Sequence, residues 1–253
     1  MTERRCKILD VLAKQRRIEV STLSAMLAVS QVTVRKDLDI LENRGLIRRE
    51  HGFATLDNVD DVGRRLALHY SIKRRIAQAA AQMVEDGETV MIESGSCCAL
   101  LAEELATKKR DVTIVTNSVF IANHIRHVPF GKLILLGGYY QSDSQVLVGS
   151  ITRKCAEIFF SSKLFIGVDG FNEKLGFTGK DHHRAQTVQT LAEQVSQIIV
   201  LTESVKFNNH GVVGLIDSKE VDTVFTDDGI PKEKELFLIN HEVAVHKICS
   251  NAA

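Results

Sequence analysis

The chain has 253 residues, of which 44% are hydrophobic and 25% charged, an ordinary composition for a globular protein of one or two domains. No apolar run approaches the ~18 residues that a membrane span needs, and charged residues interrupt the start where a signal peptide is apolar. Five scattered cysteines favour a reducing compartment over a disulfide framework, so we expect a cytoplasmic protein.

The net charge of zero is unevenly distributed along the chain. Residues 1–56 hold 11 Lys and Arg against 7 Asp and Glu, whereas the remainder holds 21 against 25. A basic segment followed by an acidic remainder indicates that only the N-terminal part meets a polyanion such as DNA.

The N-terminal segment has the pattern of a helix-turn-helix. A first amphipathic helix is predicted where apolar residues recur at helical spacing, at Ile8, Leu9, Val11 and Leu12. A short second helix follows, with Ser21 as its predicted N-cap. After a turn at Ala28-Val29, Ser30 is placed to cap a third helix that runs from Gln31 to Asn43. Two short helices joined by such a turn are typical of DNA-binding proteins.

The third helix is predicted to read DNA. Projection at 100° per residue puts Val34, Leu38 and Leu41 on a core stripe and leaves short polar residues and two adjacent cations free. Beyond Gly45, a predicted helix C-cap, two short strands around His51-Gly52 predict a wing. The expected DNA-binding residues are Ser30, Gln31, Thr33, Arg35, Lys36, Arg48, Arg49 and His51. The alternative is that these charges form a solvated face of a three-helix bundle.

The stretch from Ser30 to Phe53, S-Q-V-T-V-R-K-D-L-D-I-L-E-N-R-G-L-I-R-R-E-H-G-F, resembles the signature of DeoR-type bacterial transcriptional regulators. Those usually show S-x-x-T-I-R-R-D-L, then L-x-x-x-G, then R-x-H-G-G. Lys36 replaces the second arginine and loses its bidentate geometry. Phe53 replaces the second wing glycine, so we expect a stiffer wing tip or a packed aromatic ring. H-G-F, V-D-D-V and G-F-T-G-K-D resemble the YciT-like branch.

The remainder of the chain alternates strands with helices. Residues 57–63 are predicted as an acidic linker, and His69 to Met83 as a helix. Apolar runs of strand length then occur at Thr89–Ile92, Val112–Thr116, Lys132–Leu136, Leu164–Val168, Ile198–Thr202, Thr223–Thr226 and Val243–His246. This βαβ pattern predicts an α/β fold with a mostly parallel sheet. We expect a winged helix-turn-helix domain at 1–56, a linker and connecting helix at 57–75, and an effector-sensing domain at 76–253.

Small polar turns follow the predicted strands, where ligands bind in parallel sheets. The Ser94–Cys97 turn opens a helix whose N-terminus can cradle a phosphate. Asp169 can accept from sugar hydroxyls, and Lys206 can neutralise charge. The expected effector-binding residues are Ser94, Gly95, Ser96, Cys97, Asn117, Gly137, Gly138, Asp169, Gly170 and Lys206. Small polar residues end strands in most proteins, so any one of these turns is ordinary by itself. Five such turns at the same edge of a sheet favour a ligand pocket.

This half also resembles the DeoR-type sensor domain, which is similar in fold to ribose-phosphate isomerases. The family's D-S-G-T-T-T, L-x-G-G, G-V-D-G and D-x-S-K-F appear here as E-S-G-S-C-C, L-L-G-G, G-V-D-G and E-S-V-K-F. The resemblance implies a phosphorylated-sugar effector. Two cysteines in place of threonines reduce the number of hydroxyls around that ligand, and Glu203 replaces an aspartate.

Three functions account for these features. A sugar-phosphate isomerase would use Asp169 or Glu203 as base and Lys206 as electrostatic stabiliser. A redox-responsive regulator would use Cys97 and Cys98 at their helix N-terminus. A transcriptional regulator explains both halves, since an isomerase has no use for a DNA-reading domain. We therefore expect a repressor, not an enzyme, released from double-stranded operator DNA by a small phosphorylated metabolite.

Other sequence features bear on the oligomeric state and on metal or cofactor binding. Paired operator sites require protein symmetry, so a homo-oligomer is expected. The histidine pairs His124-x-x-His127 and His182-His183 have no cysteine or carboxylate at ligand spacing. No metal or other cofactor is therefore predicted.

Overall fold

The chain forms two compact units, Met1–Ser71 and Ile72–Ala253. The computed structural model describes residues 1–56 and 62–249, so most of the predicted acidic linker lies outside the described residues. The division between the units falls inside helix α5 (Tyr70–Ala80). The domain boundaries expected from the sequence, at residues 56 and 75, stay a prediction.

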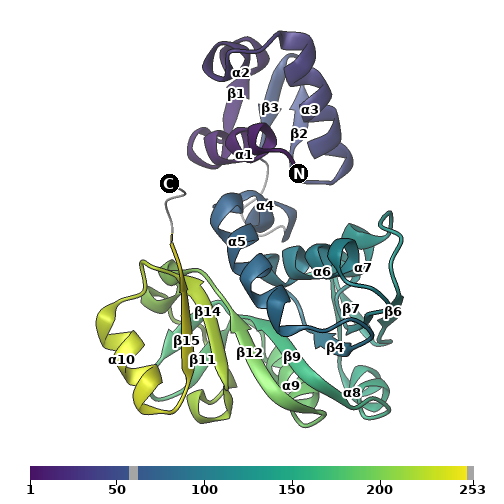
Figure 1. Ribbon diagram of the computed structural model, residues 1–253, viewed down its shortest axis with the longest axis vertical. Coiled ribbons are helices and arrows are strands. Elements are labelled where there is room, and N and C mark those ends of the chain that lie inside the picture. Colours follow the sequence, from purple (N-terminus) through teal and green to yellow (C-terminus); the bar gives the residue numbers. More distant parts are fainter. Residues whose placement is uncertain (57–61, 250–253) are drawn as a thin grey trace. The chain divides into compact units, whose positions relative to one another are not determined.

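The first unit is a winged helix-turn-helix (Figure 1). Its elements are α1 (Glu3–Gln15), β1 (Arg17–Glu19), α2 (Val20–Leu27), α3 (Gln31–Asn43), β2 (Arg48–Glu50), β3 (Phe53–Thr55) and α4 (Val62–Ala67). The strands form an antiparallel sheet in the order β1-β3-β2. The predicted core stripe of α3 is confirmed, because Val34, Leu38 and Leu41 are fully buried.

The prediction of Ser21 as an N-cap is wrong, and β1 was not predicted. Helix α2 begins one residue earlier, at Val20, and its N-cap is Glu19. The reason is tertiary: β1 pairs with β3, and the Val20 N–H donates to the Gly52 carbonyl over 2.9 Å. The chain therefore passes from strand to helix without a side-chain cap.

Helix α3 has the predicted ends. Ser30 caps it by accepting from the Thr33 N–H, and Gly45 follows the C-cap residue Arg44 with φ +69°. The Gly45 N–H donates to the Glu42 carbonyl and the Leu46 N–H to that of Leu41, which is a Schellman motif.

Helices α4 and α5 differ from the predicted linker and helix. Helix α4 begins at Val62, inside the segment predicted as a linker. Helix α5 begins at Tyr70, because His69 has a left-handed φ of +50°. A 3-10 turn, η1 (Ala81–Met83), continues α5 as far as predicted.

The second unit is built on a seven-stranded sheet that confirms the predicted fold class. All seven predicted strands are present and all neighbours are parallel, in the order β15-β14-β12-β9-β4-β5-β6. Their bounds are β4 (Thr89–Ile92), β5 (Thr113–Thr116), β6 (Lys132–Leu135), β9 (Ser161–Gly167), β12 (Val195–Leu201), β14 (Thr223–Asp227) and β15 (Ala244–Ile248).

The order of the strands reverses between β4 and β9, and this defines a topological switch point. Right-handed crossovers put α6 (Ser96–Lys108) and α7 (Val119–Ile125) on one face and α9 (His182–Ala192) on the other, as Figure 1 shows. The remaining helical segments are α8 (Ser150–Ala156), α10 (Lys232–Asn240), η2 (Ser204–Asn208) and η3 (Ser218–Glu220). Ligands bind at the carboxyl ends of strands beside such a point.

In the described part of the second unit, five short strands lie outside the large sheet and were not predicted. They form a hairpin, β7 (Tyr139–Gln141) with β8 (Val146–Val148), and a small antiparallel sheet of β10 (Gly170–Asn172), β11 (Gly176–Gly179) and β13 (Val213–Ile216). Each is three or four residues long, too short for a period-two pattern to identify. Phe171 and Phe177 of the small sheet pack edge to face in the core.

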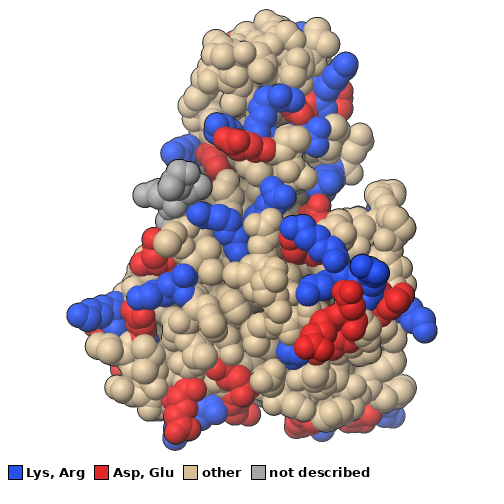
Figure 2. All heavy atoms as spheres, viewed as in Figure 1, with Lys and Arg blue, Asp and Glu red and all other residues tan. Residues whose placement is uncertain are grey.

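The surface carries both signs of charge. Figure 2 shows Lys and Arg interspersed with Asp and Glu on the face in view. Within the described ranges, no helix combines the length and apolar character that a membrane span requires.

Candidate functional site

The exposed face of α3 presents most of the predicted DNA-binding residues. Gln31, Arg35 and Lys36 are exposed, and the Arg35 guanidinium donates to the Gln31 side chain over 3.4 Å. Ser30 and Thr33 share a different task, since the Thr33 N–H donates to Ser30 Oγ over 3.2 Å to form the cap. The free end of the helix is therefore a polar surface with two cations.

Asp37, on the same helix, is a functional candidate that the sequence analysis missed. Its carboxylate is buried and accepts from Arg4 Nε and, over 2.8 Å, from Arg5 Nε. Burial raises the pKa of Asp37, but the hydrogen bonds from the two arginines outweigh burial and hold it below its ordinary value. These bonds fasten α3 to α1, more than thirty residues earlier.

The wing has the predicted turn, with His51 at φ +37° and Gly52 at φ +89° between β2 and β3. Arg48 and His51 are exposed, as a DNA contact requires. Arg49 instead points to α3: its guanidinium pairs with Asp39, and its N–H donates to Glu42 Oε1 over 2.9 Å. Arg49 therefore anchors the wing, and its contact with DNA stays a prediction.

The sequence left two alternatives for Phe53, a stiffer wing tip or a packed ring, and the structure shows a packed ring. The Arg17 guanidinium lies 4.1 Å from the centre of the Phe53 ring, a cation–π contact between β1 and β3. The contact joins the wing to the first strand and stiffens its base.

The predicted effector site lies at the switch point. The end of β4 and the end of β9 meet so closely that a Cβ at Gly95 would be 3.3 Å from the Gly167 Cα, and a Cβ at Gly167 would be 2.6 Å from the Ser94 carbonyl. Gly95 has φ +118° and starts α6 without a side-chain cap. The first N–H groups of α6, from Ser96 onward, therefore face the strand ends, as an anion site requires.

Arg184 of α9 pairs with both carboxylates at the switch point and was missed by the sequence analysis. Its Nε and Nη2 donate to the two oxygens of Glu93 over 2.8 and 2.9 Å, and its Nη1 donates to Asp169 over 3.1 Å. A further bond reaches the Gly167 carbonyl over 2.7 Å. Burial opposes the charged guanidinium, but the two carboxylates outweigh burial and raise its pKa above the ordinary value.

Lys206 and Glu203 follow β12 on the other side of the switch point. Lys206 is half-buried on η2, whereas Glu203 is buried and pairs with Lys73 of α5 over 3.2 Å. Asp227 at the end of β14 holds η2 in place by accepting from the Ser204 N–H over 2.7 Å. The sequence analysis included Lys206 but not Lys73.

Asn117 directly follows β5 and is fully buried. Its Nδ2 donates to the Leu147 carbonyl over 3.0 Å, and its own carbonyl accepts from the Leu147 N–H over 2.8 Å. Within the described part of the chain, its Oδ1 has no hydrogen-bond partner. Asn117 thus fastens β8 to the sheet and keeps one acceptor for a ligand or water.

Two of the three predicted glycines beyond the Ser94–Cys97 turn have packing roles. A Cβ at Gly138 would lie 1.9 Å from Thr152 Oγ1, and a Cβ at Gly170 would lie 2.4 Å from the Asn209 carbonyl. Gly137 is less restricted, but its carbonyl accepts from the Thr152 hydroxyl over 2.8 Å. Their contact with an effector stays a prediction.

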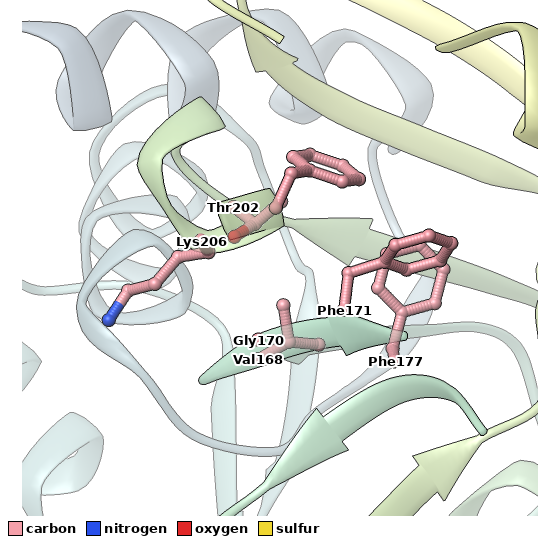
Figure 3. A pocket seen from close by; sticks show the side chains of 7 residues that line it. Val168, Gly170, Phe171, Phe177, Thr202 and Lys206 are labelled. Carbon is pink, nitrogen blue, oxygen red and sulfur yellow. The ribbon is translucent and has the colours of Figure 1, made fainter. Parts of the chain in front are cut away.

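A small pocket opens where β9 and β12 end (Figure 3). Its lining is mostly aromatic and aliphatic, and comprises Val168, Gly170, Phe171, Phe177, Thr202, Lys206 and Phe207. Figure 3 shows the Lys206 ammonium directed away from Phe171 and Phe177, so the charge lies at the edge of the pocket. The pocket therefore adjoins the polar strand ends rather than coinciding with them.

The surroundings of both thiols at the start of α6 disfavour their ionisation. Burial, followed by the charge of Glu203, raises the pKa of Cys97 to about 12. Burial and Glu93 raise the pKa of Cys98 well above its ordinary value. The reactive species is the thiolate, which both environments disfavour.

The structure also tests the arrangement of possible metal ligands. In the described part of the chain, no three His, Cys, Asp or Glu side chains are grouped to hold a metal ion. His124 Nε2 instead lies 3.0 Å from Glu103 Oε2, and the rings of His182 and His183 are in tilted contact.

Comparison with known families matches both units. Residues 4–59 match the profile of the DeoR-like helix-turn-helix domain, and residues 68–228 match that of the DeoR C-terminal sensor domain.

Several known proteins are similar over most of the chain. The "Putative aga operon transcriptional repressor" of Escherichia coli O157:H7 is 32% identical over 92% of this chain and 88% of its own. The glycerol-3-phosphate regulon repressor of Escherichia coli K12 is 26% identical over 96% of this chain and 97% of its own. The HTH-type transcriptional repressor GlcR of Bacillus subtilis is 28% identical over 89% of this chain and 88% of its own.

Similarity to solved structures is weaker. Ribose 5-phosphate isomerase A of Methanocaldococcus jannaschii aligns with a TM-score of 0.41 and 16% identity over 55% of each chain. The probable sor operon regulator of Shigella flexneri aligns with a TM-score of 0.42 and 12% identity, over 66% of this chain and 88% of its own.

Proposed function

Since the chain belongs to the DeoR family of transcriptional regulators, we propose that it is a repressor whose binding to operator DNA is controlled by a phosphorylated sugar or a related metabolite. One of the relatives named above is the repressor of a glycerol-3-phosphate regulon, which supports an effector of this class. The YciT-like branch is a finer proposal that rests on the sequence motifs alone.

The exposed face of α3 is the observation that carries the DNA-binding part of this proposal. The helix is capped at Ser30, fastened through Asp37, and leaves Arg35 and Lys36 exposed. Its N-terminal half can enter a major groove while the wing, with Arg48 and His51, meets the backbone.

The effector part is supported by the N-terminus of α6 beside Lys206. Free N–H groups at the start of a 13-residue helix and one half-buried cation are what a phosphate needs. Asp169 and Asn117 are candidates for the hydroxyls of the ligand, although Asp169 already accepts one bond from Arg184.

The isomerase alternative is less well supported. Its candidate bases, Asp169 and Glu203, each face a buried cation, Arg184 or Lys73. Taking up a proton would remove one negative charge from beside that buried cation, which is costly in the interior. The redox alternative requires thiolates that burial disfavours. We therefore propose a sensor that binds its ligand without turnover, in a homo-oligomer that acts in the cytoplasm.

The test begins by isolating the operator from genomic DNA with the full-length protein and measuring gel shifts with glucose 6-phosphate, fructose 6-phosphate and glycerol 3-phosphate. One of them should weaken operator binding by about fivefold or more without forming product, and its unphosphorylated form should not. Arg35→Ala should abolish specific binding, whereas Lys14→Ala, which removes an exposed cation of α1, should not.

Lys206→Ala should keep operator binding and lose the response to the phosphorylated compound. A normal response in this variant would place the anion elsewhere. Conversion of any of the compounds to product would restore the isomerase alternative.

A further inference from the structure

Helix α5 is shared by the two compact units, and each unit holds it by a side chain. Within the first unit, Ser71 Oγ donates to Asp10 Oδ2 of α1 over 2.9 Å. Two residues later, within the second unit, Lys73 Nζ lies 3.2 Å from Glu203 Oε2. Less than one helical turn therefore separates a bond to the DNA-binding unit from a bond to the sensor.

The Lys73–Glu203 ion pair is enclosed by protein. The side chains are only 3% and 9% exposed. A buried lysine and a buried glutamate stabilise each other only at close range, and either of them alone would be strongly unfavourable. The pair therefore fixes the position of α5 against the end of β12.

The pair also adjoins the proposed anion site. Glu203 is the N-cap residue of η2, and its carbonyl accepts from the N–H of Lys206 over 3.0 Å. Cys97, in the first turn of α6, lies within electrostatic range of Lys73, Lys206, Glu203 and Asp227. Two cations and two carboxylates are thus grouped around the start of the helix that would hold a phosphate.

A phosphate at this position would change the forces on the pair. It carries about −1.5 to −2 charges, so it repels Glu203 and attracts Lys73. Both effects weaken the ion pair, and with it the attachment of α5 to the segment that follows β12. Because α5 continues without interruption to Ser71, the change reaches α1 through the Ser71–Asp10 bond.

We propose that the Lys73–Glu203 ion pair is the coupling element through which anion binding at the start of α6 is transmitted along α5 to the DNA-binding unit. Lys73 is a positioning residue in this role, and the proposal rests on the proposed function. Coupling needs an element that both sites bias, and α5 satisfies that requirement.

The test is amide hydrogen exchange of the full-length protein, with inorganic phosphate as the probe and ionic strength held constant with sodium chloride. In the wild type, phosphate should protect the first turn of α6 and speed exchange in α5 by about fivefold or more. The variant Lys73→Met/Glu203→Gln, which removes both charges together, should keep the α6 protection and lose the α5 response. Lys73→Arg should retain both.

The matched control is Lys163→Met/Glu88→Gln. It removes a partly buried ion pair at the opposite, amino-terminal end of the same sheet and should leave the α5 response intact. Ser71→Ala gives a milder second variant, in which α5 should respond but α1 should not.

The outcomes separate the two proposals. If phosphate protects α6 but α5 does not respond, or if the neutral double variant still responds in α5, the coupling role is wrong and the anion site stands. If phosphate changes neither helix, the proposed anion site is wrong and the coupling role falls with it.

Discussion

Asp37 shows how one buried carboxylate can hold the helix proposed to read DNA. Replacing it with Asn keeps its shape but removes the ion pairs with Arg4 and Arg5. We expect Asp37→Asn to lower the free energy of unfolding of the first unit by about 2 kcal/mol, below the usual cost of breaking a buried pair because both arginines reach solvent. Urea denaturation followed by circular dichroism measures this loss.

Asp39→Asn is the matched control on the same helix. Asp39 is exposed and its bond to Arg49 lies at the surface, so we expect a change within about 0.5 kcal/mol. Equal losses in the two variants would mean that Asp37 does no more than a surface carboxylate.

The lowered pKa of Asp37 also sets a direction for pH dependence. Its folded-state pKa lies below the unfolded value of about 3.9. The stabilisation is therefore fully present above that value and is lost as pH falls through the folded-state pKa. The wild type should lose more stability on acidification than Asp37→Asn does.

At the scale of elements, Gly138 decides how the β7–β8 hairpin and α8 fit together. A Cβ there would overlap Thr152 Oγ1 and lie 2.9 Å from the Val148 carbonyl. We expect Gly138→Ala to destabilise the second unit by about 1–3 kcal/mol through overpacking, measured as a lower midpoint in urea.

Gly137→Ala is the control for Gly138. Its Cβ would meet Ile151 and Cys155 at 3.6 and 3.7 Å, an ordinary contact, so stability should change little. A loss of the effector response in this stable variant would support Gly137 as a binding residue. A stable Gly138→Ala protein would contradict the packing role assigned to Gly138.

The elements themselves differed in how well the sequence predicted them. The seven long strands were predicted because continuous apolar runs mark strands buried in a parallel sheet. The five short strands were missed because their pairing depends on neighbours outside each segment. The prediction that Ser30 caps α3 is confirmed. The prediction that Ser21 caps α2 is wrong, because the pairing of β1 with β3 makes the helix begin at Val20.

At the scale of the whole molecule, each of the two compact units should be stabilised most by the ligand that it binds itself. Operator DNA should raise the melting temperature of Met1–Ser71, and the phosphorylated effector that of Ile72–Ala253. A ligand at a hundred times its Kd adds about 2.7 kcal/mol to the stability of the unit that binds it. Differential scanning calorimetry of the full chain would resolve two transitions.

Lys206→Ala is the control for the calorimetry. It should abolish the shift caused by the effector and keep the shift caused by DNA. A single transition that both ligands raise equally would show that the units unfold together.

The sequence by itself determined the class of protein and its local elements. Caps, helical periodicity, apolar runs and family motifs each lie within about twenty residues, so they can be recognised without knowing the fold. These signals located α3, the wing, the parallel strands and the strand ends where a ligand would bind.

Only the tertiary structure decided which charges meet. Arg184 joins Glu93 across 91 residues, Arg5 joins Asp37 across 32, and Lys73 of α5 joins Glu203. In the sequence, each member of these pairs is indistinguishable from an ordinary surface charge. Their pairing follows from strand order and helix placement, which bring distant segments together, so burial and electrostatics could be assigned only after the fold was known.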